Sequence, residues 1–109
     1  LMKILKFLLI IISVYFSLLQ PSYSNEEILK KGLEIFNETA ACSGCHALKA
    51  AGAEADIGPN LDTVSLTKES VLEMVTWGLG VMPAYGEEEI LTPEEIEIVS
   101  KYVVNSAGK

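Results

Sequence analysis

The 109-residue sequence contains no arginine, and its eight lysines are outnumbered by 15 aspartate and glutamate residues. The formal net charge at pH 7 is therefore −7. Nucleic acids and anionic lipids are bound by clustered cationic side chains, so the chain is a poor candidate for either partner. The acidity favours association with positively charged partners at rates that fall with salt. It would equally serve to keep a small protein soluble.

Histidine and cysteine are also scarce, which restricts the possible metal and redox sites. His46 is the only histidine, and Cys42 and Cys45 are the only cysteines. A structural zinc site takes four ligands, commonly two pairs, and the second pair is missing. A thioredoxin-like pair would need a βαβ context, whereas no segment alternates apolar and polar residues as a strand does. A disulfide between the two cysteines remains an alternative, because an exported chain could form one.

The one long apolar run lies at the N-terminus. Lys3 and Lys6 precede an almost unbroken apolar run from Phe7 to Leu19, and Ser22-Tyr23-Ser24 follows. A secretory signal peptide has a basic start, an apolar centre and then two small residues at the positions that a signal peptidase recognises, here Ser22 and Ser24. Spanning a bilayer takes roughly 20 apolar residues, which is more than this run supplies. We therefore expect residues 1–24 to be a cleaved signal peptide, with retention as a membrane anchor as the alternative.

Residues 25–109 are expected to form one domain. The segment 1–24 holds two of the eight lysines and no acidic residue, so six lysines face 15 acidic residues in the domain and its net charge is −9. Apolar residues recur at helical spacing over 25–40, after Thr67 as far as Gly78, and from Thr92 to near Gly108. Thr92-Pro93-Glu94-Glu95 combines a capping threonine, a first-turn proline and a glutamate three residues after the cap. The fold class predicted is all-α, with three to four short helices and glycine-rich loops between them.

Cys42-Ser43-Gly44-Cys45-His46 has the C-x-x-C-H spacing typical of covalent haem attachment. Two thiols separated by two residues in a helical turn can each add to one of the two vinyl groups of a haem. The histidine that follows can then take an axial iron position. The adjacent histidine and the export signal favour this interpretation over a disulfide, a thioredoxin-like pair or a zinc site. We predict one haem c, covalently bound with its iron, on Cys42, Cys45 and His46.

The opposite face of the iron would need a second ligand in a low-spin carrier. With no other histidine, methionine is the natural candidate. Met82 lies in a loop whose glycines permit close approach to a ring, and Pro83 keeps that loop out of a helix. Met74 falls in an apolar helical stripe and is expected to pack in the core. We therefore predict His46 and Met82 as the metal ligands.

The order of these motifs resembles the class I c-type cytochromes. C-x-x-C-H is followed by Gly58-Pro59-Asn60-Leu61, by Met82-Pro83-Ala84-Tyr85-Gly86 and by a capped C-terminal helix. The similarity to the short bacterial and photosynthetic types, cytochromes c6, c5 and c-553, covers essentially all of 25–109. It implies the class I fold, with short helices wrapped around one haem. It also implies thioether bonds from both cysteines and iron ligation by His46 and Met82.

Further roles follow from the resemblance alone. Pro59 would offer its carbonyl oxygen to the other ring nitrogen of His46, and Leu61 would pack on the haem face. Gly32 and Phe36 would lie where the first helix crosses the last, against Tyr102. The sequence departs from cytochromes c6 at Trp77, where that branch usually has a polar residue. Trp77 could donate to a haem propionate or cover the ring edge.

With both axial positions filled, no site remains for a small-molecule substrate, so we expect no enzyme. The expected function is one-electron transfer in the periplasm, between redox protein partners whose docking faces would be basic. The thylakoid lumen is an alternative location, and membrane contact is expected only if residues 1–24 are retained. A dedicated cytochrome subunit of a periplasmic oxidoreductase complex is the alternative function. An enzyme or gas sensor would require Met82 not to bind iron.

Overall fold

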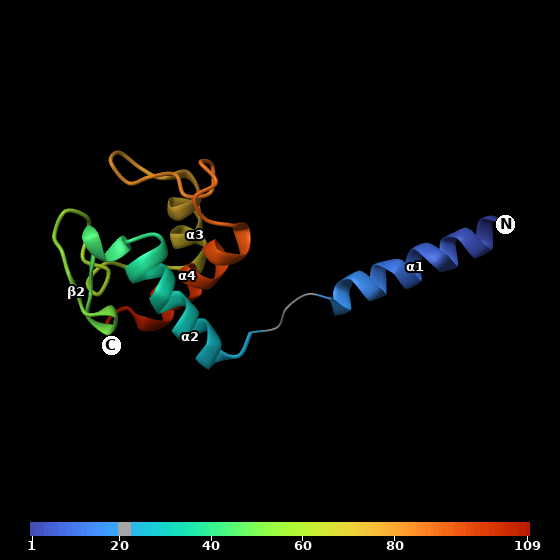
Figure 1. Cartoon of the computed structure of the whole chain (residues 1–109), viewed down its shortest axis with the longest axis horizontal. Coiled ribbons are helices and arrows are strands. Elements are labelled where there is room, and N and C mark those ends of the chain that lie inside the picture. The colour runs from blue at the N-terminus through green and yellow to red at the C-terminus, as the bar shows by residue number, and fades with distance from the viewer. Residues whose placement is uncertain (20–22) are drawn as a thin grey trace.

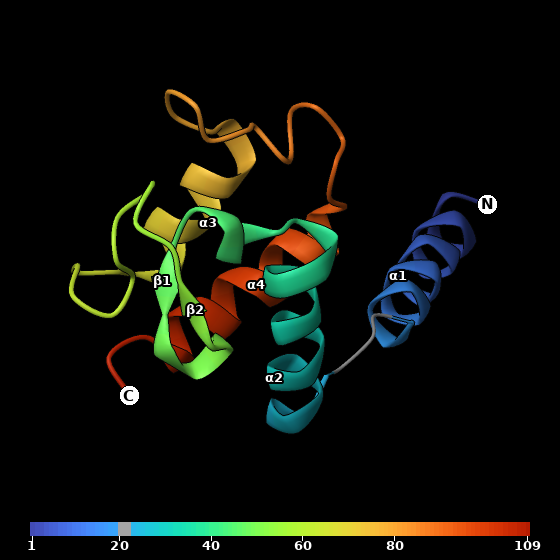
Figure 2. The same ribbon diagram turned by 60° about the vertical axis from the view of Figure 1, so that its left-hand side comes forward.

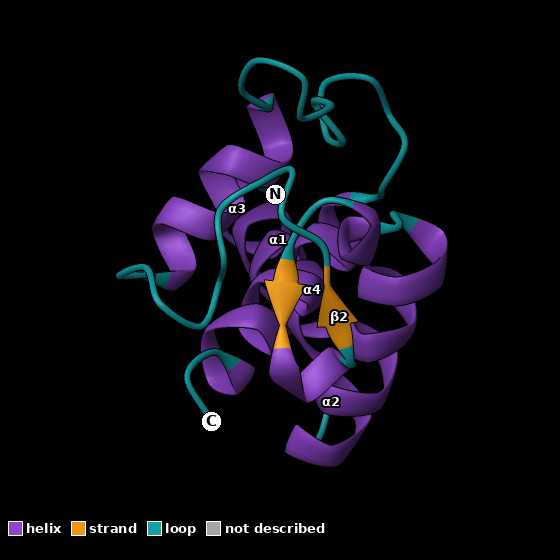
Figure 3. Cartoon of the chain, turned by 90° about the vertical axis from the view of Figure 1, so that its left-hand side faces the viewer, coloured by secondary structure: helices purple, strands orange, loops and turns teal. Residues whose placement is uncertain are grey.

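The computed structural model describes residues 1–19 and 23–109, and its elements are mostly helical (Figures 1 and 3). The α-helices are α1 (Met2–Leu18), α2 (Asn25–Glu34), α3 (Lys68–Trp77) and α4 (Pro93–Ser106). The short turns are the π-helical η1 (Ile35–Thr39) and the 3-10 helices η2 (Cys42–Gly44) and η3 (Lys49–Ala51). The strands are β1 (Ala47–Leu48) and β2 (Ala53–Glu54).

Each helix of the domain begins at a side-chain cap. Ser24, Thr67 and Thr92 each accept a hydrogen bond from the backbone N–H three residues on, and each cap N–H is bonded in return by that residue's side chain. These capping boxes satisfy backbone donors that have no partner within the helix. The predicted starts at Thr67 and Thr92 are confirmed, as is the end of α3 at Gly78.

The core lies where α4 packs against both α2 and α3 (Figure 2). Gly32 permits the close crossing of α2 and α4, because a Cβ atom at this position would lie only 2.2 Å from Tyr102 Cβ. The rings of Phe36 and Tyr102 meet beside it, with centroids 6.1 Å apart. The expected crossing of these three residues is therefore confirmed. It also explains a glycine inside a helix, which otherwise costs up to about 1 kcal/mol against alanine.

Two local features differ from the expected all-α pattern. The helix expected over 25–40 ends in the π turn η1, in which the Ala40 N–H donates to the Ile35 carbonyl at 2.9 Å. Because adjacent Ile35 and Phe36 are both buried, the spacing of apolar residues does not distinguish this turn from an α-helix. The second feature is the antiparallel pair β1–β2, whose two-residue strands are too short to show alternation.

The expectation that Met74 packs in the core is wrong, because this side chain on α3 is 40% exposed. The buried stripe of α3 consists of Val71 and Val75, which lie one turn apart and belong to the core cluster. Met74 directly precedes Val75 and therefore projects from the neighbouring, more exposed face of the helix.

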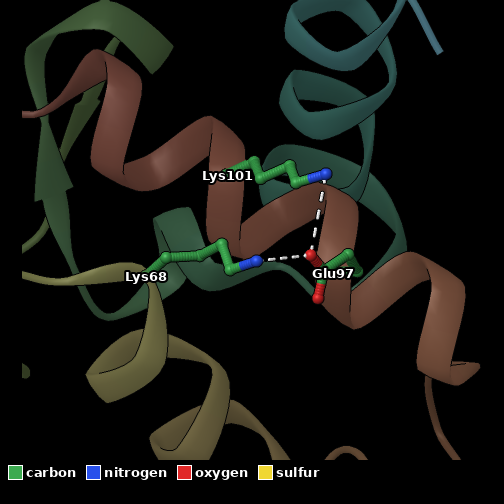
Figure 4. Close-up of polar contacts among 3 residues, drawn as sticks. All are labelled: Lys68, Glu97 and Lys101. Carbon is green, nitrogen blue, oxygen red and sulfur yellow. Dashed lines mark hydrogen bonds and ion pairs between the residues drawn. The ribbon is translucent and has the colours of Figure 1, made fainter.

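A charged contact also joins α3 to α4. Glu97 accepts a hydrogen bond from Lys68 at 2.7 Å and forms an ion pair with Lys101 at 3.6 Å (Figure 4). The Lys68 hydrogen bond, helped by the nearby charge of Lys101, lowers the pKa of Glu97. All three side chains are more than one third exposed, so solvent screening keeps this contribution to stability small.

The helix α1 covers most of the segment expected to be the signal peptide, and none of its residues is buried. In the parts of the chain that the structure describes, no helix has the length and hydropathy for a bilayer crossing. Gln20, Pro21 and Ser22, which belong to the expected cleavage region, lie outside the described residues.

Candidate functional site

The C-x-x-C-H segment forms a tight turn, which carries both thiols and the imidazole. The N–H groups of Cys45 and His46 both donate to the carbonyl of Cys42, at 3.1 and 2.9 Å. Ala41, just before the turn, takes a left-handed conformation with φ of 53°. Such a conformation is costly for a residue with a side chain, and strained residues of this kind cluster at functional sites, although exposed Glu89 also has it, with φ of 55°.

His46 is oriented by its own hydrogen bond. Its Nδ1 lies 2.8 Å from the carbonyl oxygen of Pro59, which is the contact that the resemblance implies. A carbonyl can only accept, so Nδ1 carries the proton and donates it. In the neutral ring, Nε2 then keeps its lone pair and can bind a metal ion. An oxygen that accepts from the second ring nitrogen is the usual support for a metal-binding histidine.

Gly58 holds the other side of this imidazole. Its N–H donates to the Cys45 carbonyl at 2.7 Å, which brings the loop before Pro59 against the C-x-x-C-H turn. A Cβ atom at Gly58 would lie 2.5 Å from His46 Cε1. That distance is too short for real contacts, so only glycine fits here with the ring in this position.

Both cysteines are free thiols, so the disulfide that the sequence left open is not formed in this structure. Cys42 is half-buried and Cys45 is exposed. Burial raises the pKa of the Cys42 thiol to about 11, so this thiol is protonated at neutral pH. Among the described residues, no group of three or more histidine, cysteine, aspartate or glutamate side chains could by itself hold a metal ion.

Met82 lies in a loop fixed at both ends by backbone hydrogen bonds. The N–H of Met82 donates to Leu79 at 3.0 Å, and the N–H of Leu79 donates to Met82 at 3.3 Å. Gly78, with φ of 69°, lets the chain leave α3 and pass close to Met82, since a Cβ there would lie 2.5 Å from the Met82 carbonyl. The Met82 side chain is half-buried and packs against the core.

The remaining predicted residues occupy two separate surroundings. Pro59 is exposed, and its carbonyl oxygen bonds to His46. Leu61 is half-buried and packs against the core, and its N–H donates to the Ala47 carbonyl at 3.0 Å. Trp77 is 60% exposed at the end of α3. It lines a cavity of about 550 Å³ together with Met82, Glu88 and the intervening loop 78–84. The structure thus groups Pro59 and Leu61 with the C-x-x-C-H turn, and Trp77 with Met82.

Two residues with a clear structural part in the site were given no role by the sequence. One is Gly58, and its signal was the glycine–proline pair that opens Gly58-Pro59-Asn60-Leu61. The other is Tyr85, whose hydroxyl group donates to the Ala40 carbonyl at 3.0 Å. Tyr85 thereby joins the Met82 loop to the segment just before Cys42.

The residues present fit a covalently bound haem. They supply two free thiols at the required spacing, an imidazole with a free Nε2 lone pair, and a thioether sulfur on a separate loop. Large apolar side chains of the same segments are well exposed: Ile57 by 70%, Leu79 by 71% and Val81 by 89%. Such side chains suit contact with a large apolar group better than contact with water.

Comparisons with known proteins point the same way. Residues 27–103 match the family model for cytochrome C oxidase, cbb3-type, subunit III. A cytochrome c6 of Gloeothece citriformis (strain PCC 7424) is 31% identical over 102 residues, covering 86% of this chain and 84% of that protein. The crystal structure of the c-type cytochrome SorU from Sinorhizobium meliloti is similar with a TM-score of 0.72. The two are 47% identical, and the match covers 78% of this chain and 97% of SorU.

Proposed function

The chain belongs to the class I c-type cytochromes, and from this premise we propose that it is a periplasmic one-electron carrier with His46 and Met82 as axial haem ligands. Membership of the family implies covalently bound haem c with its iron. The observation that best supports the ligand assignment is the His46–Pro59 hydrogen bond, which leaves Nε2 free on the residue that directly follows Cys45.

The roles proposed for individual residues follow from their chemistry. Bound haem c would supply a one-electron Fe(III)/Fe(II) couple. Cys42 and Cys45 would hold it through thioether bonds, while Pro59 keeps the His46 ring oriented and increases its basicity. The Met82 sulfur would favour a comparatively high reduction potential. Leu61 would pack on the ring, and Trp77 would cover its edge or donate to a propionate.

The two axial positions of the haem iron decide between an electron carrier and an enzyme. A haem held by His46 and Met82 leaves no iron position for a substrate, so electron exchange with other proteins is the chemistry that remains. The acidic surface, with a net charge of −9 over 25–109, favours partners with basic docking faces.

Replacing Met82 with alanine tests the ligand assignment. M82A should keep covalent haem, lose the weak far-red band of a ferric iron–sulfur bond and bind carbon monoxide when reduced. Its reduction potential should fall by tens to hundreds of millivolts, within the roughly 0.8 V over which axial ligands act. M74A is the matched control, because Met74 is an exposed methionine on α3. A far-red band that survives in M82A would show that another group binds the iron.

Residues 1–24 are proposed to be the export signal, with Asn25 as the new N-terminus. The structure adds a consequence, since Ser24 caps α2. Cleavage after Ser24 would remove this cap, and losing one typically costs about 0.5–2 kcal/mol. Mass spectrometry of the exported protein should show a chain beginning at Asn25. A chain that keeps residues 1–24 would support the membrane-anchor alternative.

A dedicated cytochrome subunit of one oxidoreductase complex is the second candidate. The observation that favours it is the exposed apolar group of Leu79, Val81 and Trp77, as far as bound haem would leave these side chains uncovered. A freely diffusing monomer keeps such patches small. Gel filtration of a native periplasmic extract, followed by the haem absorbance, distinguishes the two. Elution at the size of the monomer supports the mobile carrier, and elution in a stable larger species supports the subunit.

A further inference from the structure

Tyr85 connects the two halves of the site. Its hydroxyl group donates to the carbonyl oxygen of Ala40 at 3.0 Å, across 45 positions in the sequence. Ala40 is buried at the end of η1, two residues before Cys42. Tyr85 itself lies three residues after Met82. The bond therefore joins the segment that would carry the haem to the loop that would supply its sulfur ligand.

Both ends of this connection are fixed by other contacts. The Tyr85 N–H donates to the Val75 carbonyl of α3 at 3.0 Å, and the Tyr85 carbonyl accepts from Ile90 at 2.9 Å and from Leu91 at 3.0 Å. At the other end, the Ala40 N–H donates to Ile35 at 2.9 Å, within the π turn. A hydrogen bond between two such fixed points restrains the distance between them, because neither backbone can shift without breaking further bonds.

The loop between Leu79 and Met82 is closed by the two backbone hydrogen bonds between these residues, and its other contacts are few. Leu79 and Val81 are 71% and 89% exposed, and Gly80 has φ of 59°. Segments with exposed side chains and few buried contacts open at low free-energy cost. Besides its own packing against the core, the Met82 side chain therefore depends on the restrained residues that follow it.

We infer that Tyr85 is a positioning residue, which holds the Met82 loop against the C-x-x-C-H segment through its hydrogen bond to the Ala40 carbonyl. This inference rests on the proposed ligation by Met82. Tyr85 does not bind the iron. It acts by limiting how often the loop opens and the sulfur leaves.

The test is the rate at which added imidazole replaces the sulfur ligand of the ferric holoprotein, followed as loss of the far-red band. Y85F keeps the ring and removes only the hydroxyl group. The far-red band of Y85F should be present before imidazole is added. The rate at which imidazole replaces the sulfur ligand should rise roughly two- to tenfold, as expected for one lost hydrogen bond.

Two control variants separate this effect from a general loss of stability. Y102F also removes a buried tyrosine hydroxyl, but one that makes no hydrogen bond to the Ala40 segment or to the Met82 loop. I98V weakens the core at a buried side chain of α4, which belongs to neither segment. Both should exchange at the wild-type rate, and a rate in I98V that rises as much as in Y85F would show a purely global effect and overturn the inference.

The remaining outcomes are also distinguishable. A far-red band in the wild-type protein, together with an unchanged rate in Y85F, would overturn the inference and leave the proposed function standing. Absence of the band from the wild-type protein would overturn the ligation by Met82, and the inference with it.

Discussion

Gly58 lies against the imidazole of His46, where a side chain would have no room. The ring is held between this glycine and the carbonyl of Pro59, 2.8 Å from Nδ1. Its orientation therefore depends on a loop that lies well beyond the C-x-x-C-H segment in the chain. The two cysteines and the histidine can be recognised from C-x-x-C-H alone, because their spacing is local. The groups that orient the histidine cannot be recognised from that motif, because Gly58 and Pro59 contact His46 only after their loop has folded back.

We predict that G58A disturbs the proximal side of the site. The added Cβ would meet His46 Cε1 at 2.5 Å, so the ring or the loop must move. Overpacking of this kind typically costs about 1–3 kcal/mol. In a domain of this size each kcal/mol lowers Tm by roughly 4–8 °C. Thermal unfolding of the holoprotein measures the loss, and the reduction potential should shift as well. An unchanged Tm and potential would show that Gly58 does not constrain His46.

The helices α3 and α4 start where their threonine caps predicted, because a cap and its partner lie within one turn of chain. The π turn η1 and the strand pair β1–β2 could not be predicted in this way. The π turn ends at Ala40, which is bonded to the distant Tyr85, and the two-residue strands are too short to show alternation. The Met74 expectation failed at the same scale, since a short apolar stripe does not say which of its members faces the partner helix.

Asp62 links the C-terminal end of the chain to the loop after β1. Its carboxylate accepts the N–H of Gly108 at 2.8 Å and the N–H of Lys49 at 2.8 Å. These two donors lower the pKa of Asp62, with the Gly108 bond as the larger cause. Since the folded pKa lies below the unfolded value, this contribution to stability is present above about pH 4 and is lost as the pH falls through the folded pKa.

Thermal unfolding of D62N as a function of pH tests this link. D62N should have a lower Tm than the wild-type protein at pH 7, and the difference should shrink as the pH falls below about 4. D56N, a change at an exposed aspartate in the preceding loop, is the matched control and should follow the wild-type curve. A difference between D62N and wild type that stays constant down to pH 3 would contradict an ionised Asp62 as its cause.

At the scale of the whole molecule, the dominant feature is the strong excess of acidic residues over 25–109. The charge of −9 over 25–109 creates a long-range field that attracts cations and repels anions. Salt screens this field over about 10 Å at 0.1 M ionic strength. The rate of electron exchange should therefore depend on the sign of the partner's charge.

Stopped-flow reactions with small inorganic partners measure this dependence. Oxidation of the reduced protein by a cationic cobalt complex should slow as ionic strength rises, whereas oxidation by ferricyanide should become faster. The absorbance of the haem reports both reactions. Rates that respond to salt in the same direction for both oxidants would contradict electrostatic steering by the acidic surface.

The central claim is a haem attached at Cys42 and Cys45 and ligated by His46 and Met82. The most direct measurement is the absorption spectrum of the mature protein, produced with a haem-maturation system and recorded in both oxidation states. We predict the bands of covalent c-type haem, a far-red band from the ferric iron–methionine bond and no ready binding of carbon monoxide. Covalent haem that lacks this band and binds carbon monoxide would contradict the carrier and indicate an open-site enzyme or sensor. A protein without covalent haem would contradict the whole account.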